Sequence, residues 1–192
     1  MDKQTRILIY AFLSRLFATE IDAKSLRDLR ANTPLLELLG SECKNWLSLK
    51  SDEEILEELA VDFSTLFLMN AVPIESAVLD AKNEVLVGLE NPVMNFYFTN
   101  GYEINLNITK IVAPDHLAIE LGFAQNLVAK DDYATLQKFF EKHLMAWVPP
   151  YLIGVKHAAM TPFYRAVCDF GAEFLVADYG YVTSMGLNLD GR

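Results

Sequence analysis

The chain has 192 residues, of which 52% are hydrophobic and 22% are charged, and its formal net charge at pH 7 is −10. This length and this apolar content exclude a disordered chain and predict a single domain with one core. The acidic excess excludes nucleic acid and anionic membrane surfaces as expected partners, and it favours cationic ones.

The cysteines and the N-terminus indicate a soluble protein of a reducing cytoplasm. Cys43 and Cys168 are far apart, and neither has a second cysteine at metal-ligand spacing. The apolar N-terminal segment contains Arg15 and no small-residue cleavage site follows it, so we expect a retained helix rather than a signal peptide. No run reaches the roughly 18 apolar residues of a membrane span.

Apolar residues recur at helical spacing in the first quarter of the chain. They predict a first core helix over 3–18 and a short second helix around Leu26 and Leu29. Pro34 is expected to open a third helix, whose middle Gly40 weakens.

A fourth helix is expected to start at Ser51, which precedes three acidic residues, and to run towards Met69. Pro73 then predicts a loop, 77–88 is compatible with another helix, and Pro92 with a short one.

The stretch PDHLAIELGFAQNLV predicts the central helix. Pro114 is tolerated at a helix start, and Asp115 is expected to accept the exposed amide hydrogens there. His116 and Glu120 stand one turn apart, so two acids and a histidine should lie at the mouth of the helix rather than buried along its length. The apolar stripe expected to face the core comprises Leu117, Leu121, Ala124 and Val128.

The C-terminal part predicts a helix over 133–147, an interruption at Pro149 and Pro150, and a short helix over 151–159. Thr161 is expected to cap a long final helix. Residues 103–112 alternate like a strand but have no partner strand, so we expect an extended linker. The pattern predicts an all-α fold, one globular domain of about eight to ten helices.

The candidate chemistry is sparse. His116, Glu120, His143 and His157 are suitable metal ligands, but they provide only one pair at i, i+4, so we favour structural roles and no metal site. There is no GxSxG elbow and no phosphate-binding glycine loop.

Two groups of side chains carry a structural and a functional interpretation side by side. The structural one is a solvated helix face for the acids Asp52, Glu53, Glu54, Glu57, Glu58 and Asp62. It is a core position for the aromatic residues Phe63, Phe67, Phe139, Phe140, Trp147, Phe163 and Tyr164. The functional one is a peptide groove, in which a partner's apolar part lies between helices while acids meet its basic end.

Several motifs, in order, resemble the TorD/DmsD/NarJ group of redox-enzyme maturation chaperones. The family signature PDH-x-x-x-EL-x-F is matched by Pro114, Asp115, His116, Glu120, Leu121 and Phe123. The aromatic-x-x-LF segment and the PYES-like turn are matched by Phe63, Leu66, Phe67, Pro73, Glu75 and Ser76. The downstream motifs are matched by His143, Leu144, Trp147, Pro149, Phe163, Tyr164 and Arg165. The departures are Ile74, where the family often has an aromatic residue, and Val78 and Leu79, where tyrosine is common.

The resemblance implies an all-α, cytoplasmic, non-enzymatic chaperone. Its partners would be the twin-arginine leader and the apo-form of a molybdoenzyme catalytic subunit, whose cofactor insertion it would assist before export. The resemblance also implies no resident cofactor, weak binding of guanine nucleotide, and a monomer or a domain-swapped dimer, for which residues 101–113 are the expected hinge.

The expected leader site combines the central helix with the loop around Pro73. Its polar part is Asp115, His116 and Glu120, faced by Pro73, Glu75 and Ser76. Its apolar part is Leu121, Phe67 and Trp147. Structural alternatives stay open, namely a helix cap for Asp115 and a hydrogen-bonded brace for His116.

Two rival functions also stay open. One is an assembly factor that binds a mature redox subunit away from its leader, as NarJ-like proteins do. The other is a helical metal- or nucleotide-dependent hydrolase that uses His116, Glu120 and another histidine.

Overall fold

The computed structural model describes residues 1–79, 85–86, 88–104 and 111–189. These residues are predominantly helical and include no strand, which confirms the all-α class. They form two compact units. The first unit comprises Met1–Ala18, Pro73–Pro149 and Leu175–Arg192, and the second comprises Thr19–Val72 and Pro150–Phe174. The expectation of a single domain stays a prediction, and residues 105–110 of its expected hinge lie outside the described residues.

Helices of the first unit come from both ends and the middle of the chain. They are α1 (Lys3–Ala18), α6 (Glu75–Leu79), the 3-10 helix η2 (Gly88–Glu90), α7 (Pro92–Thr99), α8 (Leu117–Ala129), α9 (Tyr133–Phe139) and the π-helix η4 (Phe140–Leu144). Two further helices, α10 (Met145–Ala158) and α11 (Pro162–Leu189), contribute residues to both units.

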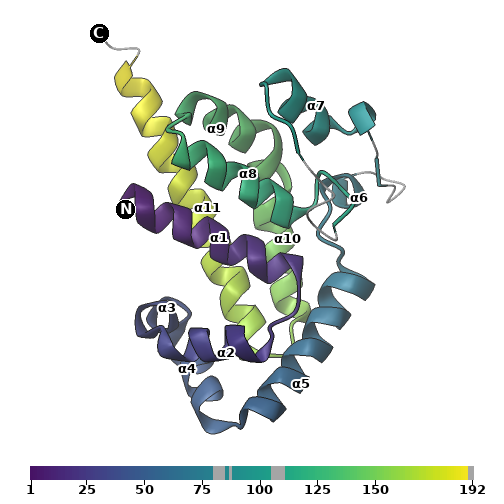
Figure 1. The fold of residues 1–192 in the computed structure, drawn as a ribbon, viewed down its shortest axis with the longest axis vertical. Coiled ribbons are helices and arrows are strands. Elements are labelled where there is room, and N and C mark those ends of the chain that lie inside the picture. Colours follow the sequence, from purple (N-terminus) through teal and green to yellow (C-terminus); the bar gives the residue numbers. More distant parts are fainter. Residues whose placement is uncertain (80–84, 87, 105–110, 190–192) are drawn as a thin grey trace. The chain divides into compact units, whose positions relative to one another are not determined.

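The first unit is held together by α1, which packs along α8 (Figure 1). Ser14 on α1 donates a hydrogen bond of 2.7 Å to the carbonyl of Ala118 on α8. Arg6 forms a buried, two-pronged ion pair with Asp178 at 2.5 and 2.9 Å, and the hydroxyl of Tyr10 donates to the same carboxylate at 2.7 Å. These contacts fix the N-terminal helix against the central helix and against the end of α11.

The second unit begins with α2 (Ala23–Ala31), α3 (Thr33–Leu38), α4 (Gly40–Leu49), α5 (Asp52–Phe63) and the π-helix η1 (Ser64–Asn70). The expected third helix is divided into α3 and α4, because Gly40 has a φ of +86°, which a right-handed helix does not contain. The start predicted at Ser51 is confirmed, since Ser51 and Glu54 form a reciprocal capping box.

The predicted interruption at Pro149 and Pro150 is wrong, because α10 continues through both residues. Each proline ring holds φ near the helical value, so both residues keep the helical conformation, although their missing N–H groups remove two intrahelical hydrogen bonds. The expected helix over 77–88 is described only as α6, and residues 80–84 and 87 lie outside the described residues.

One of the expected surface acids is a core residue. Asp62 is completely buried, and its carboxylate accepts hydrogen bonds from the N–H of Met160, the N–H of Thr161 and the hydroxyl of Thr161 at 3.1, 2.8 and 2.6 Å. Thr161 in turn caps α11, as predicted, by accepting from the N–H of Tyr164 at 3.3 Å. The solvated position predicted for Asp62 is therefore wrong.

The expected aromatic core is confirmed. All seven side chains are buried: Phe63, Phe67, Phe139, Phe140, Trp147, Phe163 and Tyr164. None of the helices in the described residues is both long enough and apolar enough to cross a membrane.

Candidate functional site

The candidate site is built on a short antiparallel pairing of two loops in the first unit. An isolated bridge joins Ile74 to His116. The N–H of Glu75 donates to the carbonyl of Asp115 at 2.9 Å, and the N–H of Leu117 donates to the carbonyl of Pro73 at 2.8 Å. The pairing brings the loop at Pro73 against the start of α8, two segments that the sequence analysis expected to face each other.

The start of α8 differs from the expected one. The helix begins at Leu117, and His116 is its N-cap, with the ring Nδ1 accepting a hydrogen bond from the N–H of Ala118 at 3.1 Å. Burial lowers the pKa of His116 from 6.5 to about 4, against the opposing effect of Asp115. The ring is therefore neutral at neutral pH, as an accepting Nδ1 requires.

Asp115 precedes the N-cap of α8, and its side chain contacts a different helix, α6. Its side chain is 1% exposed and accepts a hydrogen bond from the backbone N–H of Ser76, near the start of α6, at 2.9 Å. Ser76 extends the network, because its hydroxyl accepts from the N–H of Leu86 at 3.2 Å. The prediction that Asp115 lies in the first turn of the central helix is wrong. Its carboxylate instead accepts a hydrogen bond at the start of α6.

Glu120 is completely buried in the first turn of α8. The indole N–H of Trp147 on α10 donates to its carboxylate at 3.3 Å. The expectation that Asp115 and Glu120 lie exposed at the helix mouth is wrong, because α8 is buried on most of its circumference and not only along the predicted stripe.

The environment of Glu120 favours its neutral form. Burial raises the pKa of its carboxyl well above the ordinary value of 4.5. The negative charges of Glu75 and Asp115 act in the same direction, and the hydrogen bond from Trp147 opposes them.

Glu75 is paired with a histidine that the site prediction did not include. The Nδ1 of His143, in η4, lies 2.9 and 3.2 Å from the two carboxylate oxygens of Glu75, and both side chains are buried. The imidazole packs against Phe96 and Phe139, each with 5.3 Å between ring centroids. This packing fixes the ring so that one nitrogen faces the carboxylate.

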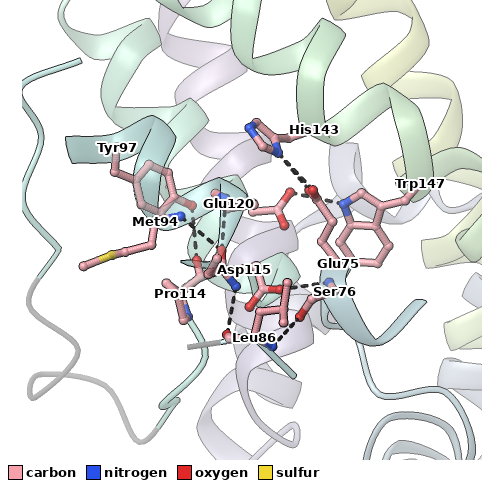
Figure 2. A network of polar contacts seen from close by, with 12 residues as sticks. Glu75, Ser76, Leu86, Met94, Tyr97, Pro114, Asp115, Glu120, His143 and Trp147 are labelled. Carbon is pink, nitrogen blue, oxygen red and sulfur yellow. Dashed lines mark hydrogen bonds and ion pairs between the residues drawn. The ribbon is translucent and has the colours of Figure 1, made fainter. Parts of the chain in front are cut away.

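Two residues at α7 complete the polar network: Tyr97, which is labelled in Figure 2, and Asn91, which precedes the helix. The hydroxyl of Tyr97 donates to the carbonyl of Pro114 at 3.3 Å. Asn91 caps α7 with its side-chain oxygen and donates through its amide nitrogen to the carbonyl of Leu86 at 3.0 Å.

We call Glu75, Asp115 and Glu120 the buried carboxylate cluster; they lie close together in Figure 2. Within the described residues, its one contact with a basic side chain is that between Glu75 and His143. Asp115 Oδ1 and Glu120 Oε1 have no hydrogen-bond partner there. The cluster thus carries more acceptor capacity than the described residues use, and buried oxygens of this kind are usually satisfied by a donor.

The remaining predicted site residues are core residues. Pro73 and Leu121 are buried in the first unit. Phe67 belongs to the second unit, where its ring contacts Phe63 and Tyr164 at centroid distances of 5.3 and 5.5 Å.

The two histidines of the first unit, His116 and His143, have different partners. The ring of His116 caps α8, whereas His143 faces Glu75. The part of the chain that is described contains no group of three or more His, Cys, Asp or Glu side chains arranged to hold a metal ion.

The sequence carried signals for the residues that the site prediction omitted. His143 lies four residues before Trp147, which the prediction did include, so the two share a helix face, and both belong to one of the family motifs. Asn91 precedes Pro92, a combination typical of a helix start. Nothing in the sequence indicated that Tyr97 would reach the loop before α8.

Comparisons with known proteins agree with the motifs. Residues 22–152 match the family described as the nitrate reductase delta subunit. The chain is 28% identical to the chaperone protein TorD of Shewanella pealeana, over 94% of this chain and 91% of that protein. It is 25% identical to the chaperone protein TorD of Colwellia psychrerythraea, over 95% and 94% of the two chains, and 25% identical to that of Histophilus somni, over 88% and 94%. The chain therefore belongs to the nitrate reductase delta subunit family, the TorD/NarJ group of redox-enzyme maturation chaperones.

Proposed function

We propose that this protein is a cytoplasmic, non-enzymatic chaperone that binds the twin-arginine signal peptide of a molybdenum-cofactor oxidoreductase. It holds the apo-form of the catalytic subunit while the cofactor is inserted, and so delays export until the subunit is mature. The similarity to chaperone proteins named TorD supports the chaperone role.

The observation that carries the proposal is the buried carboxylate cluster. Asp115 and Glu120 each present an oxygen without a partner among the described residues, and within that part of the chain no lysine or arginine forms an ion pair with the cluster. A guanidinium group offers five N–H donors in one plane and binds carboxylates through paired hydrogen bonds. The cluster therefore suits the arginines of the leader better than it suits a neutral peptide.

Access to the cluster requires a local opening, because all three carboxylates are buried. The element best suited to move is α6, which has five residues and carries Glu75 and Ser76. The start of α6 depends on contacts such as the hydrogen bond that Asp115 accepts from Ser76. The arginines of the leader would replace the donors that α6 provides.

The overall charge supports the same kind of partner. A net charge of −10 attracts a peptide whose N-terminal region is basic, and this attraction weakens as salt screens it.

Calorimetric titration of the purified protein with twin-arginine leader peptides from its own genome tests the proposal. We expect micromolar or tighter binding that weakens at higher salt, and a marked loss when the two arginines are replaced by lysines. The Asp115→Asn variant should bind the leader more weakly. The matched control is Glu37→Gln, which neutralises an exposed carboxylate of α3 in the second unit and should bind like the wild type. No binding of any leader overturns the proposal.

A second candidate is an assembly factor that recognises a mature redox subunit. The description of the matched family as the nitrate reductase delta subunit favours it. Binding of the mature client without its leader, together with no binding of the leader alone, would establish this function instead.

The expected guanine-nucleotide binding and the expected choice between a monomer and a domain-swapped dimer stay proposals. Titration with GTP and size-exclusion chromatography over a range of concentrations test them separately.

A further inference from the structure

We propose that the buried carboxylate cluster holds a proton on Glu120 in the free protein and releases it when an arginine of the leader enters, so that leader binding is linked to pH. This inference rests on the proposed function and adds a regulatory property to the same site.

The three carboxylates of the cluster have unequal support for a negative charge. Asp115 accepts the backbone N–H of Ser76, and Glu75 faces the imidazole of His143. Glu120 has only the neutral indole N–H of Trp147, through a longer hydrogen bond of 3.3 Å, and its Oε1 has no partner in the described region. If one member of the cluster takes up a proton, Glu120 is the member with the weakest support for a negative charge.

The charged groups around Glu120 disfavour its ionised form. Glu120 interacts with Glu75 of α6 and with Asp115 of the loop before α8, and both oppose a negative charge on Glu120. From η4, His143 is engaged by Glu75, and α10 presents the neutral donor Trp147.

A further titratable group comes from α7, where Tyr97 has its pKa raised by burial first and then by Glu120, Glu75 and Asp115. Among the described residues, the groups that act on the pKa of Glu120 are Glu75, Asp115 and Trp147, and none of them is a cation, so the raised pKa agrees with this arrangement.

The proton balance of binding follows directly. The neutral carboxyl of Glu120 and a guanidinium cation become a carboxylate–guanidinium pair, and the released proton passes to the buffer. Binding of one leader then releases up to one proton, so the affinity should rise with pH, by at most about tenfold per pH unit, until Glu120 is ionised in the free protein.

The protonated state is tested without any ligand. The infrared difference spectrum between the wild type and Glu120→Gln at pH 7 should contain the carbonyl band of a neutral carboxylic acid, which disappears as the pH is raised. Glutamine keeps an oxygen that accepts from Trp147, so the variant should fold. If it does not, the pH titration of the side-chain carboxyl carbons by NMR in the wild type gives the same information. A spectrum without a neutral buried acid at pH 7 overturns the proposal.

The released proton is tested by titrating the leader peptide in phosphate and in Tris, two buffers with very different ionisation enthalpies. We expect the wild type to release a fraction of a proton up to one proton per leader, and Glu120→Gln to release none at this site. Tight binding without proton release overturns the linkage and leaves the proposed function intact. Absence of leader binding overturns the proposed function and the linkage together, whatever the infrared result.

Discussion

Asp115 accepts a hydrogen bond from the backbone N–H of Ser76, 39 residues earlier in the chain, at 2.9 Å. Both residues are buried, so this contact replaces the water that the start of α6 would otherwise need. The acid of the PDH motif therefore fastens a neighbouring helix, and its second oxygen remains without a partner among the described residues.

Asp115→Ala should lower the free energy of unfolding by roughly 1–3 kcal/mol, because the N–H of Ser76 loses its buried acceptor. Asp115→Asn keeps an acceptor oxygen, so its free energy of unfolding should fall less than that of Asp115→Ala. Urea denaturation of the two variants beside the wild type measures the difference. Equal stability of all three proteins would show that the contact does not support α6.

His116 should make stability depend on pH between about 6.5 and about 4. Its pKa in the folded protein is about 4, below the ordinary 6.5, so the unfolded chain binds a proton first as the pH falls. The stabilisation by the neutral cap is complete above 6.5 and is lost as the pH falls towards 4, a change of up to about 3 kcal/mol.

Denaturation at several pH values checks this, with His116→Asn as the matched variant. Asparagine is a good N-cap that does not titrate, so the free energy of unfolding of this variant should fall less over this pH range than that of the wild type. A His116→Asn variant with the same pH dependence as the wild type would show that another group is responsible.

His143→Ala should destabilise the protein by about 3 kcal/mol or more, because it leaves Glu75 buried without its partner. His157→Ala is the control, since His157 is an exposed histidine on α10, the helix that directly follows η4. Thermal melting distinguishes the two variants. If both melt like the wild type, the Glu75–His143 pair contributes no net stability.

Asp62→Ala should lower the free energy of unfolding by roughly 2–4 kcal/mol, because three donor groups of Met160 and Thr161 in the second unit lose their acceptor. Glu57→Ala is a suitable control, since Glu57 is an exposed acid on the same helix. Chemical denaturation of both variants should separate them clearly, and equal stability would contradict the anchoring role of Asp62.

Local signals in the sequence predicted much of the fold. The apolar spacing of 3–18 predicted α1 as observed, and the residues at Ser51, Pro92 and Thr161 predicted helix starts that the structure contains. Helix starts are predictable because capping depends on residues that are neighbours in sequence.

Tertiary contacts decided the features that the sequence analysis missed. Asp62 follows five other acids and looks like part of a solvated face, yet its partners are about 100 residues away. Glu120 lies beside the predicted stripe of α8, but helices cover that side as well. The motif residues predicted that the loop at Pro73 faces α8, whereas the hydrogen-bonding role of each side chain required the structure.

A double-mutant cycle between the protein and the leader tests the central claim most directly. Asp115→Asn is combined with a leader in which the twin arginines are replaced by glutamines, and calorimetry gives the four affinities. If the buried carboxylate cluster binds the arginines, the two changes should be coupled by at least about 1 kcal/mol. A coupling energy near zero, with the leader still bound by the wild type, would contradict the account and place the arginines elsewhere on the protein.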